Sequence, residues 1–171
     1  AYPGTALTLS GGGVQTTTLN VSGSGTITDL NFSFSATYTD FRYLKLQLIS
    51  PSGTVVTLAS GSSAGGGSFS GSLAFQTIFD DEASLTITGN GRPYIGPHQP
   101  EGLFSDFDGE SITGTWTLVA FKTRENYVGD ITEWAILIET NGSAATSPPN
   151  YGTAYPGTAL TLSGGGVQTT T

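Results

Sequence analysis

Acidic side chains gather in two short segments of the sequence. Asp80 and Asp81 stand side by side in FDDEA, Asp106 and Asp108 alternate in DFDGE, and Asp40 lies further upstream. Calcium takes several hard oxygen ligands at once, and carboxylates supply them. DFDGE shares alternating acids and a glycine with calcium loops but lacks the rest of an EF-hand. We predict a structural calcium ion near Asp80 and Asp81, with Asp40 as a possible further ligand and DFDGE as a second candidate segment; solvated turns are the alternative.

Nucleophilic catalysis has little support in the residues present. The chain has a single histidine, His98, to serve as a general base, and it stands between two prolines. Ser63 occupies the serine position of a G-x-S-x-G match, but a glycine run follows it where a nucleophile elbow needs a helix. We therefore predict that the chain is not an enzyme.

Three triplets have the Asn-X-Ser pattern that accepts N-linked sugar, and they begin at Asn20, Asn31 and Asn141. Thr146 and Ser147 precede a Pro-Pro pair in a segment that suits O-linked sugar. We predict glycosylation at these positions. Asn141 is the favoured one, because it borders an expected linker and should be exposed.

Composition restricts the class of partner. Charged residues make up 11% of the chain, and 13 acidic residues against 5 basic ones give a net charge of -8. This charge repels phosphate backbones and anionic lipid head groups, so we predict no binding of nucleic acid. No stretch approaches the roughly 20 apolar residues of a spanning helix, and we predict no membrane insertion. The absence of cysteine excludes disulfides and thiolate metal sites.

The elements that must position these residues are predicted to be β-strands. Apolar and polar residues alternate with period two, as in Phe32, Phe34, Ala36 and Tyr38 opposite Asn31, Ser33, Ser35 and Thr37. The pattern returns at Leu44 to Leu48, Val56 to Leu58, Leu85 to Ile87, Trp116 to Ala120 and Trp134 to Ile138. Turn signals such as Pro51-Ser52-Gly53 separate the runs, and no helical stripe is present. Short strands with polar outer faces predict a two-sheet sandwich.

The first eighteen residues, AYPGTALTLSGGGVQTTT, recur without change as residues 154–171. Self-similarity of this kind is typical of repeat arrays, and an engineered duplication is the alternative origin. Residues 142–153 are rich in Ser, Ala, Pro and Gly and predict a linker. We therefore predict a sandwich unit at 1–141, a linker at 142–153 and the first strand of a following repeat at 154–171.

Four segments carry a family pattern: LKLQLISPSGT (residues 44–54), FDDEA (79–83), GTWTL (114–118) and the Gly129, Ile131, Trp134 spacing of GDITEW. The stretch from about Thr16 to Ile138 resembles the P domain, also called the P/Homo B domain, which follows the catalytic domain in proprotein convertases and occurs in bacterial secreted proteins. The resemblance implies an all-β jelly-roll (galactose-binding-like) antiparallel β-sandwich. It also associates the FDDEA loop with metal binding or loop stabilisation. Phe121 and Asn126-Tyr127 depart from the family, where acidic residues are expected.

Three functions follow as expectations. The first is a non-enzymatic structural repeat of an extracellular filament, sheath or adhesin, joined head to tail to neighbouring copies through the duplicated strand. The second is the accessory P domain of a secreted subtilisin-like protease, which the resemblance implies. The third is a module that binds glycans or other cell-surface components. All three predict an extracellular or cell-surface location.

Overall fold

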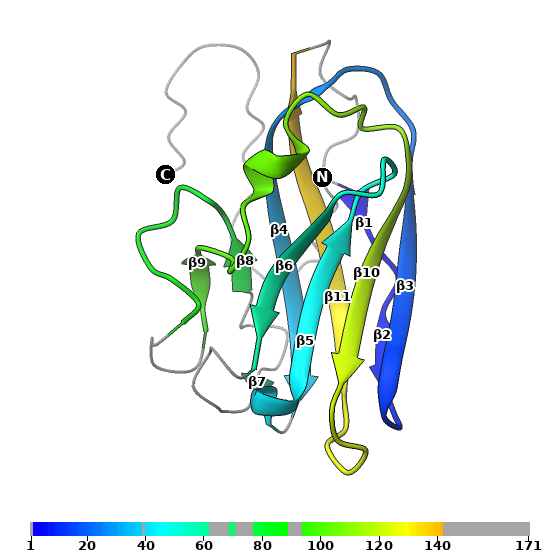
Figure 1. Ribbon diagram of the computed structural model, residues 1–171, viewed down its shortest axis with the longest axis vertical. Helices are drawn as coiled ribbons and strands as arrows, with labels where there is room; N and C mark the ends of the chain where they lie inside the picture. Colours follow the sequence, from blue (N-terminus) through cyan, green and yellow to red (C-terminus); the bar gives the residue numbers. More distant parts are fainter. Residues whose placement is uncertain (1, 39, 62–68, 71–76, 89–93, 142–171) are drawn as a thin grey trace, which may run out of the picture.

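The computed structural model describes residues 2–38, 40–61, 69–70, 77–88 and 94–141. Its strands form two β-sheets that lie face to face, as Figure 1 shows. Two short 3-10 helices, η1 (Phe41–Tyr43) and η2 (Phe104–Phe107), connect strands. The strands are β1 (Tyr2–Pro3), β2 (Leu7–Leu9), β3 (Gly13–Val21), β4 (Ile27–Tyr38), β5 (Leu44–Ile49), β6 (Val55–Ser60), β7 (Phe69–Ser70), β8 (Thr77–Phe79), β9 (Gly96–His98), β10 (Gly114–Lys122) and β11 (Gly129–Thr140).

The larger sheet has the strand order β1-β11-β4-β8-β9, with β2 also paired to β11 and β7 to β4. The smaller sheet has the order β3-β10-β5-β6. The predicted fold class, an all-β antiparallel sandwich, is confirmed. One pair differs: β8 and β9 run parallel. Parallel neighbours need a long crossover, and the chain between Phe79 and Gly96 supplies it.

One core of aromatic and aliphatic side chains fills the space between the sheets. Trp116 of β10 meets Phe107 of η2 edge to face, with ring centroids 5.2 Å apart. In the larger sheet Phe34 stacks on Phe79 at 5.7 Å. Each such ring contributes about 1.5–3 kcal/mol relative to an exposed one. The predicted inward residues Leu44, Leu46, Leu48, Val56, Leu58, Trp116, Leu118, Ala120, Trp134 and Ile136 are all buried, whereas Ile138, predicted with them, is half-buried.

The turn predicted at Pro51 to Gly53 is also present. The backbone N–H of Gly53 donates to the carbonyl of Ser50 at 3.0 Å, and the N–H of Ser50 donates to the carbonyl of Thr54 at 2.9 Å. Gly53 has φ 93°, a left-handed conformation that favours glycine. This turn places β6 antiparallel beside β5.

The prediction of a strand at Leu85 to Ile87 is wrong. Only an isolated bridge between Thr86 and Gln99 forms there. Ile87 is buried, but Leu85 is 48% exposed. The Thr86 hydroxyl donates to the carbonyl of Thr88, a local side-chain to backbone bond of the kind that competes with a β-ladder.

The polar face of β4 also differs from the expected solvent face. Ser33 and Ser35 are buried, as are Phe32 and Phe34 on the opposite face. Ser33 lies between Ala135 of β11 and Ile78 of β8, and Ser35 lies opposite Glu133 of β11. These cross-strand neighbours point to the same face of the sheet and flank the short serine side chains.

The first residues of the chain run along both sheets. β1 and β2 pair with β11 in the larger sheet, and β3 then pairs with β10 in the smaller one. Gly11 (φ 70°) and Gly13 (φ 87°) make the crossing between the sheets. The predicted linker at 142–153 and duplicated strand at 154–171 lie outside the described residues. Within the described ranges, no helix has the length and apolar character needed to cross a bilayer.

Candidate functional site

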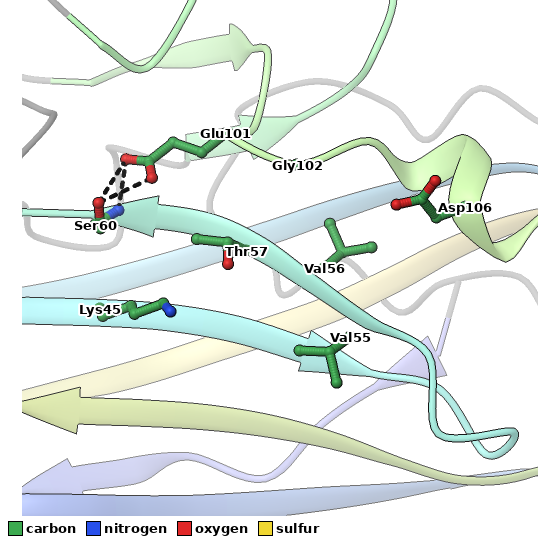
Figure 2. Close-up of a pocket in the computed structure, with 8 residues that line it drawn as sticks. All are labelled: Lys45, Val55, Val56, Thr57, Ser60, Glu101, Gly102 and Asp106. Carbon is green, nitrogen blue, oxygen red and sulfur yellow. Dashed lines mark hydrogen bonds between the residues drawn. The ribbon is translucent and has the colours of Figure 1, made fainter.

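An open pocket of about 570 Å³ lies where β5 and β6 meet the segment that leads into η2, as Figure 2 shows. Lys45 extends along the face of β5, Val55 and Thr57 project from β6, and Asp106 approaches from η2. The remaining lining residues are Val56, Ser60, Glu101 and Gly102. The pocket therefore combines an ammonium group, carboxylates and an apolar side chain on one surface.

Glu101 fixes one wall of this pocket. Its carboxylate accepts a hydrogen bond from the Ser60 backbone N–H at 2.7 Å and from the Ser60 hydroxyl at 2.8 Å. The backbone N–H groups of Glu101 and Gly102 donate to the carbonyls of Leu58 and Thr57. These bonds cover the free edge of β6 and leave fewer unpaired groups for another strand.

The pocket continues onto the outer face of the smaller sheet. Residues on this face alternate with the buried ones, and Val14 is 63% and Phe121 40% exposed. Val14 and Phe121 are paired across β3 and β10, and Lys45 is the next partner of Phe121 on β5. The outward residues are Val14, Thr16, Thr18, Asn20, Thr115, Thr117, Val119, Phe121, Lys45, Gln47, Ile49, Val55 and Thr57. Of these, only Lys45 is charged, and depletion of charge is typical of protein interfaces.

Asp81, a predicted calcium ligand, caps η2. Its carboxylate oxygens accept hydrogen bonds from the backbone N–H groups of Phe104 and Ser105, each at 3.0 Å. These N–H groups open the helix and have no partner within it. The FDDEA segment is thus hydrogen-bonded to the start of η2, the helix that also contains Asp106 and Phe107 of DFDGE. Nothing in the sequence marked this cap, because 23 residues separate Asp81 from Phe104.

Asp80 and Asp40 also have protein partners. Asp80 accepts a hydrogen bond from the backbone N–H of Glu82 at 2.8 Å, and a hydrogen bond with the Asp80 side chain raises the pKa of Glu82. Asp40 accepts from the backbone N–H of Arg42 at 3.1 Å and from its Nε at 3.0 Å. This pairing with Asp40 raises the pKa of Arg42.

The DFDGE segment is anchored in the core. Phe107 is fully buried, and the Glu110 carboxylate accepts a hydrogen bond from the Thr54 hydroxyl. Asp106 and Asp108 are exposed. The charge of Asp108 contributes to a raised pKa at Asp29.

For Asp29 the largest cause of that raised pKa is burial, and the charge of Glu139 comes next. Asp80 and Asp108 contribute less. Glu139 lies directly opposite Asp29 across β4 and β11, where two like charges repel. The charges of Glu139, Asp80 and Asp108, which lie far apart in the sequence, thus all raise the pKa of the Asp29 carboxyl.

Within the described residues, no three side chains of His, Asp or Glu are grouped closely enough to hold a metal ion. The calcium ion expected near Asp80 and Asp81 stays a prediction. A melting midpoint that falls when EGTA is added would support it, and an unchanged midpoint would contradict it.

His98 lies in β9 and is only 3% exposed. Its Nδ1 is 3.1 Å from the carbonyl oxygen of Gly96, and its ring meets Tyr94 edge to face. The ring is thus packed as part of the core. Ser63, the serine of the G-x-S-x-G match, lies outside the described residues.

The described glycosylation candidates differ in exposure. Asn20 and Asn141 are exposed, whereas Asn31 is half-buried on β4 and its amide donates to Asp29 at 3.3 Å. Asn141 accepts a hydrogen bond from the backbone N–H of Thr26 at 3.2 Å. Thr146 and Ser147 lie outside the described residues. Glycosylation stays a prediction at each position, and exposure favours Asn20 and Asn141.

A second open pocket, of about 560 Å³, lies where η1 meets the turn between β10 and β11, and no motif in the sequence indicated it. Tyr43 stacks on Tyr127 with ring centroids 4.5 Å apart, and the Arg124 guanidinium lies 5.0 Å from the centre of the Tyr43 ring. The pocket is lined by Tyr43, Thr123, Arg124, Glu125 and Asn126, and Tyr127 packs beside it on Tyr43. Tyr127, one of the departures from the family pattern, therefore packs against η1 instead of presenting an acid.

Three comparisons relate the chain to known proteins. The family model described as the proprotein convertase P-domain matches residues 27–138. No curated protein sequence matches the chain. A crystal structure of the serine protease of Aeromonas sobria matches with 19% identity and a TM-score of 0.47, and one of that protease in complex with the chaperone ORF2 matches with 17% and 0.48. Each match covers 78% of this chain and 24% of the other, so this chain spans about a quarter of the protease length.

Proposed function

Because this chain belongs to the proprotein convertase P-domain family, we propose that it is a non-catalytic accessory domain of a secreted subtilisin-like protease. The family match carries the proposal. It begins at Ile27, the first residue of β4, and ends at Ile138 in β11, so it includes the central strands of both sheets. The relationship therefore concerns the sandwich from β4 into β11 and not one motif, while β1, β2 and β3 lie outside the match.

The state of the only histidine supports a non-catalytic role. A general base must reach the proton of its nucleophile, within about 3 Å or through one water. His98 is packed against Tyr94, with its Nδ1 on a backbone carbonyl. Reaction chemistry would then belong to a separate catalytic domain, and this chain would act through contact with it.

The outer face of the smaller sheet is the surface we propose for that contact. It is extended and built mainly from threonine, valine and other uncharged side chains, with Lys45 as its one charge. The cores of protein interfaces are depleted of charged residues, as this face is, and its threonine hydroxyls can hydrogen-bond to a partner. The pocket beside Glu101 adjoins the face and would receive a side chain from the partner.

The natural protein that carries this sequence tests the proposal directly. Peptide mapping by mass spectrometry is expected to find a subtilisin-like catalytic domain in the same polypeptide. A fluorophosphonate probe for active serine hydrolases is expected to label that protein and to leave isolated residues 1–171 unlabelled. A natural protein made only of copies of this unit would overturn the protease assignment, and labelling of the isolated chain would overturn the non-catalytic role.

The exact duplication of residues 1–18 favours a second candidate, the structural repeat of an extracellular filament. Its partners would be neighbouring copies of the same unit. Negative-stain microscopy of the natural protein distinguishes the two functions. Long regular fibres would support the filament, and isolated particles at high concentration would contradict it.

A further inference from the structure

Residues 2–18 occupy a defined site along the edge of the sandwich, which we call the leading-segment site. It is formed by β11 and β10. Tyr2 is paired with Ile136, and β2 is paired with Gly129 to Ile131. The segment then crosses to the smaller sheet, where Gly13 to Thr18 pair with β10. Backbone hydrogen bonds of a β-ladder therefore hold the first half of the segment to β11 and the second half to β10.

Trp134 makes the site selective for a glycine. The backbone N–H of Gly4 donates to the carbonyl of Trp134 at 2.8 Å, and the indole Nε1 of Trp134 donates to the carbonyl of Thr5 at 2.7 Å. A Cβ added at Gly4 would lie 1.9 Å from the indole ring. Since the ring is part of the core, a side chain at this position cannot be accommodated without displacing it.

Leu9 and Lys122 anchor the middle of the segment. The Leu9 side chain is fully buried, and the Lys122 ammonium donates to the Leu9 carbonyl at 3.0 Å. Further along, the Thr17 hydroxyl donates to the carbonyl of Thr5 at 3.0 Å. The site thus recognises a particular sequence of side chains in addition to an extended backbone.

The second copy of the segment has every one of these features. Gly157 corresponds to Gly4, Leu162 to Leu9 and Thr170 to Thr17, while Gly164 and Gly166 correspond to the crossing glycines Gly11 and Gly13. Because the residues are identical, the second copy has the side chains and backbone groups needed to form the same contacts with β11 and β10. Any preference of the site for one copy must therefore come from how that copy is connected to the rest of the chain.

The connection permits the second copy to reach the site. β1 runs antiparallel to β11 and begins opposite Ile136, only a few residues before the last described residue, Asn141. Residues 142–153 separate Asn141 from the second copy. At roughly 3.3 Å per residue, twelve residues can reach up to about 40 Å, well beyond the distance of about 15 Å that the five residues from Ile136 to Asn141 imply.

We propose that the leading-segment site accepts residues 154–171 of the same chain in place of residues 1–18, so that the two identical segments are alternative occupants of one site. The first copy continues directly into Leu19 and closes no loop, which favours it in the wild-type chain. When the first copy leaves, the tethered second copy has an effective concentration in the millimolar range and outcompetes other molecules. The exchange is intramolecular and changes no contact in the core.

Matched substitutions in the two copies test this exchange by thermal unfolding. Leu9→Asp places a charge in the core only while the first copy occupies the site. We expect Leu162→Asp to melt close to wild type, Leu9→Asp to melt slightly lower because the second copy must close a loop, and the double variant to melt about 10 °C lower than wild type or more. If Leu9→Asp alone melts as low as the double variant, the second copy does not replace the first and the proposal is wrong.

A disulfide tests the occupant without disturbing the core, because the chain has no cysteine of its own. Thr8 lies opposite Asp130 on β11, so Thr161→Cys with Asp130→Cys brings two thiols together only when the second copy is in the site. In a glutathione redox buffer we expect a bond between positions 130 and 161 in a monomer, with Thr8→Cys and Asp130→Cys as the control pair. Failure to form the bond, or disulfide-linked dimers instead of monomers, would overturn intramolecular exchange.

Discussion

The ammonium nitrogen of Lys122 lies 3.0 Å from the carbonyl oxygen of Leu9, in the interior, although the two residues are 113 positions apart. Lys122 is 2% exposed, and its ammonium also lies 5.9 Å from the centre of the Tyr38 ring. This contact joins the first segment of the chain to β10. It also places a cation where water is scarce.

Burial lowers the pKa of Lys122 below the usual 10.5. Between the lowered value and 10.5, the unfolded chain binds a proton that the folded chain does not, so the free energy of unfolding rises with pH in that window. We expect Lys122→Met to abolish this rise, measured by urea unfolding at a series of pH values below 10.5. Lys45→Met on the outer face is the matched control and should keep the rise.

Tyr38 has the opposite effect at higher pH. Its hydroxyl is buried without a hydrogen-bond partner in the described residues, and burial, with the charge of Asp40, raises its pKa to about 12 from 10.0. From pH 10 to 12 the folded chain keeps a proton that the unfolded chain loses, so stability falls as pH rises. We expect Tyr38→Phe to remove a loss on the order of 1–2 kcal/mol over this window. A Tyr43→Phe control that removes the same loss would contradict this assignment.

The cap that Asp81 provides to η2 predicts a local stability effect. Asp81→Ala removes the acceptor of two backbone N–H groups and is expected to lower the free energy of unfolding by about 1–2 kcal/mol. Asp106→Ala in the same helix removes an exposed carboxylate and should cost less than about 0.5 kcal/mol. Equal losses from the two variants in chemical denaturation would show that the cap has no special role.

The outer face of the smaller sheet can be tested in the proposed protease. Phe121→Glu places a charge on the exposed face and should leave the melting midpoint of the isolated chain nearly unchanged. In the natural protein we expect the same change to lower the midpoint of the catalytic domain by several degrees, because a buried interface charge is costly. Val128→Glu, also exposed but outside this face, is the control. An unaffected catalytic domain would mean that another surface makes the contact.

Much of the fold was predictable because the alternation of a strand is local. The inward positions of Leu44 to Leu48 and Trp116 to Ala120 follow from the pleat, which turns successive side chains to opposite faces. Local alternation did not reveal that Ser33 and Ser35, on the polar face of β4, are buried like Phe32 and Phe34 on its opposite face. It also predicted a strand near Leu85, where neighbouring backbone supplies only one bridge.

The sequence alone determined the sandwich and its inward residues, since both depend on local alternation of polar and apolar residues. It also determined the duplication of the first segment, which follows from the identity of residues 1–18 and 154–171. Only the tertiary structure decided that Asp81 caps η2, that Asp40 pairs with Arg42, and that Lys122 reaches Leu9. Pairing between strands distant in sequence brings most of these groups together, and no local periodicity encodes which strands become neighbours. The duplicated segment acquires its meaning in the same way, because the site that fits it is built by β11 and β10 at the other end of the chain.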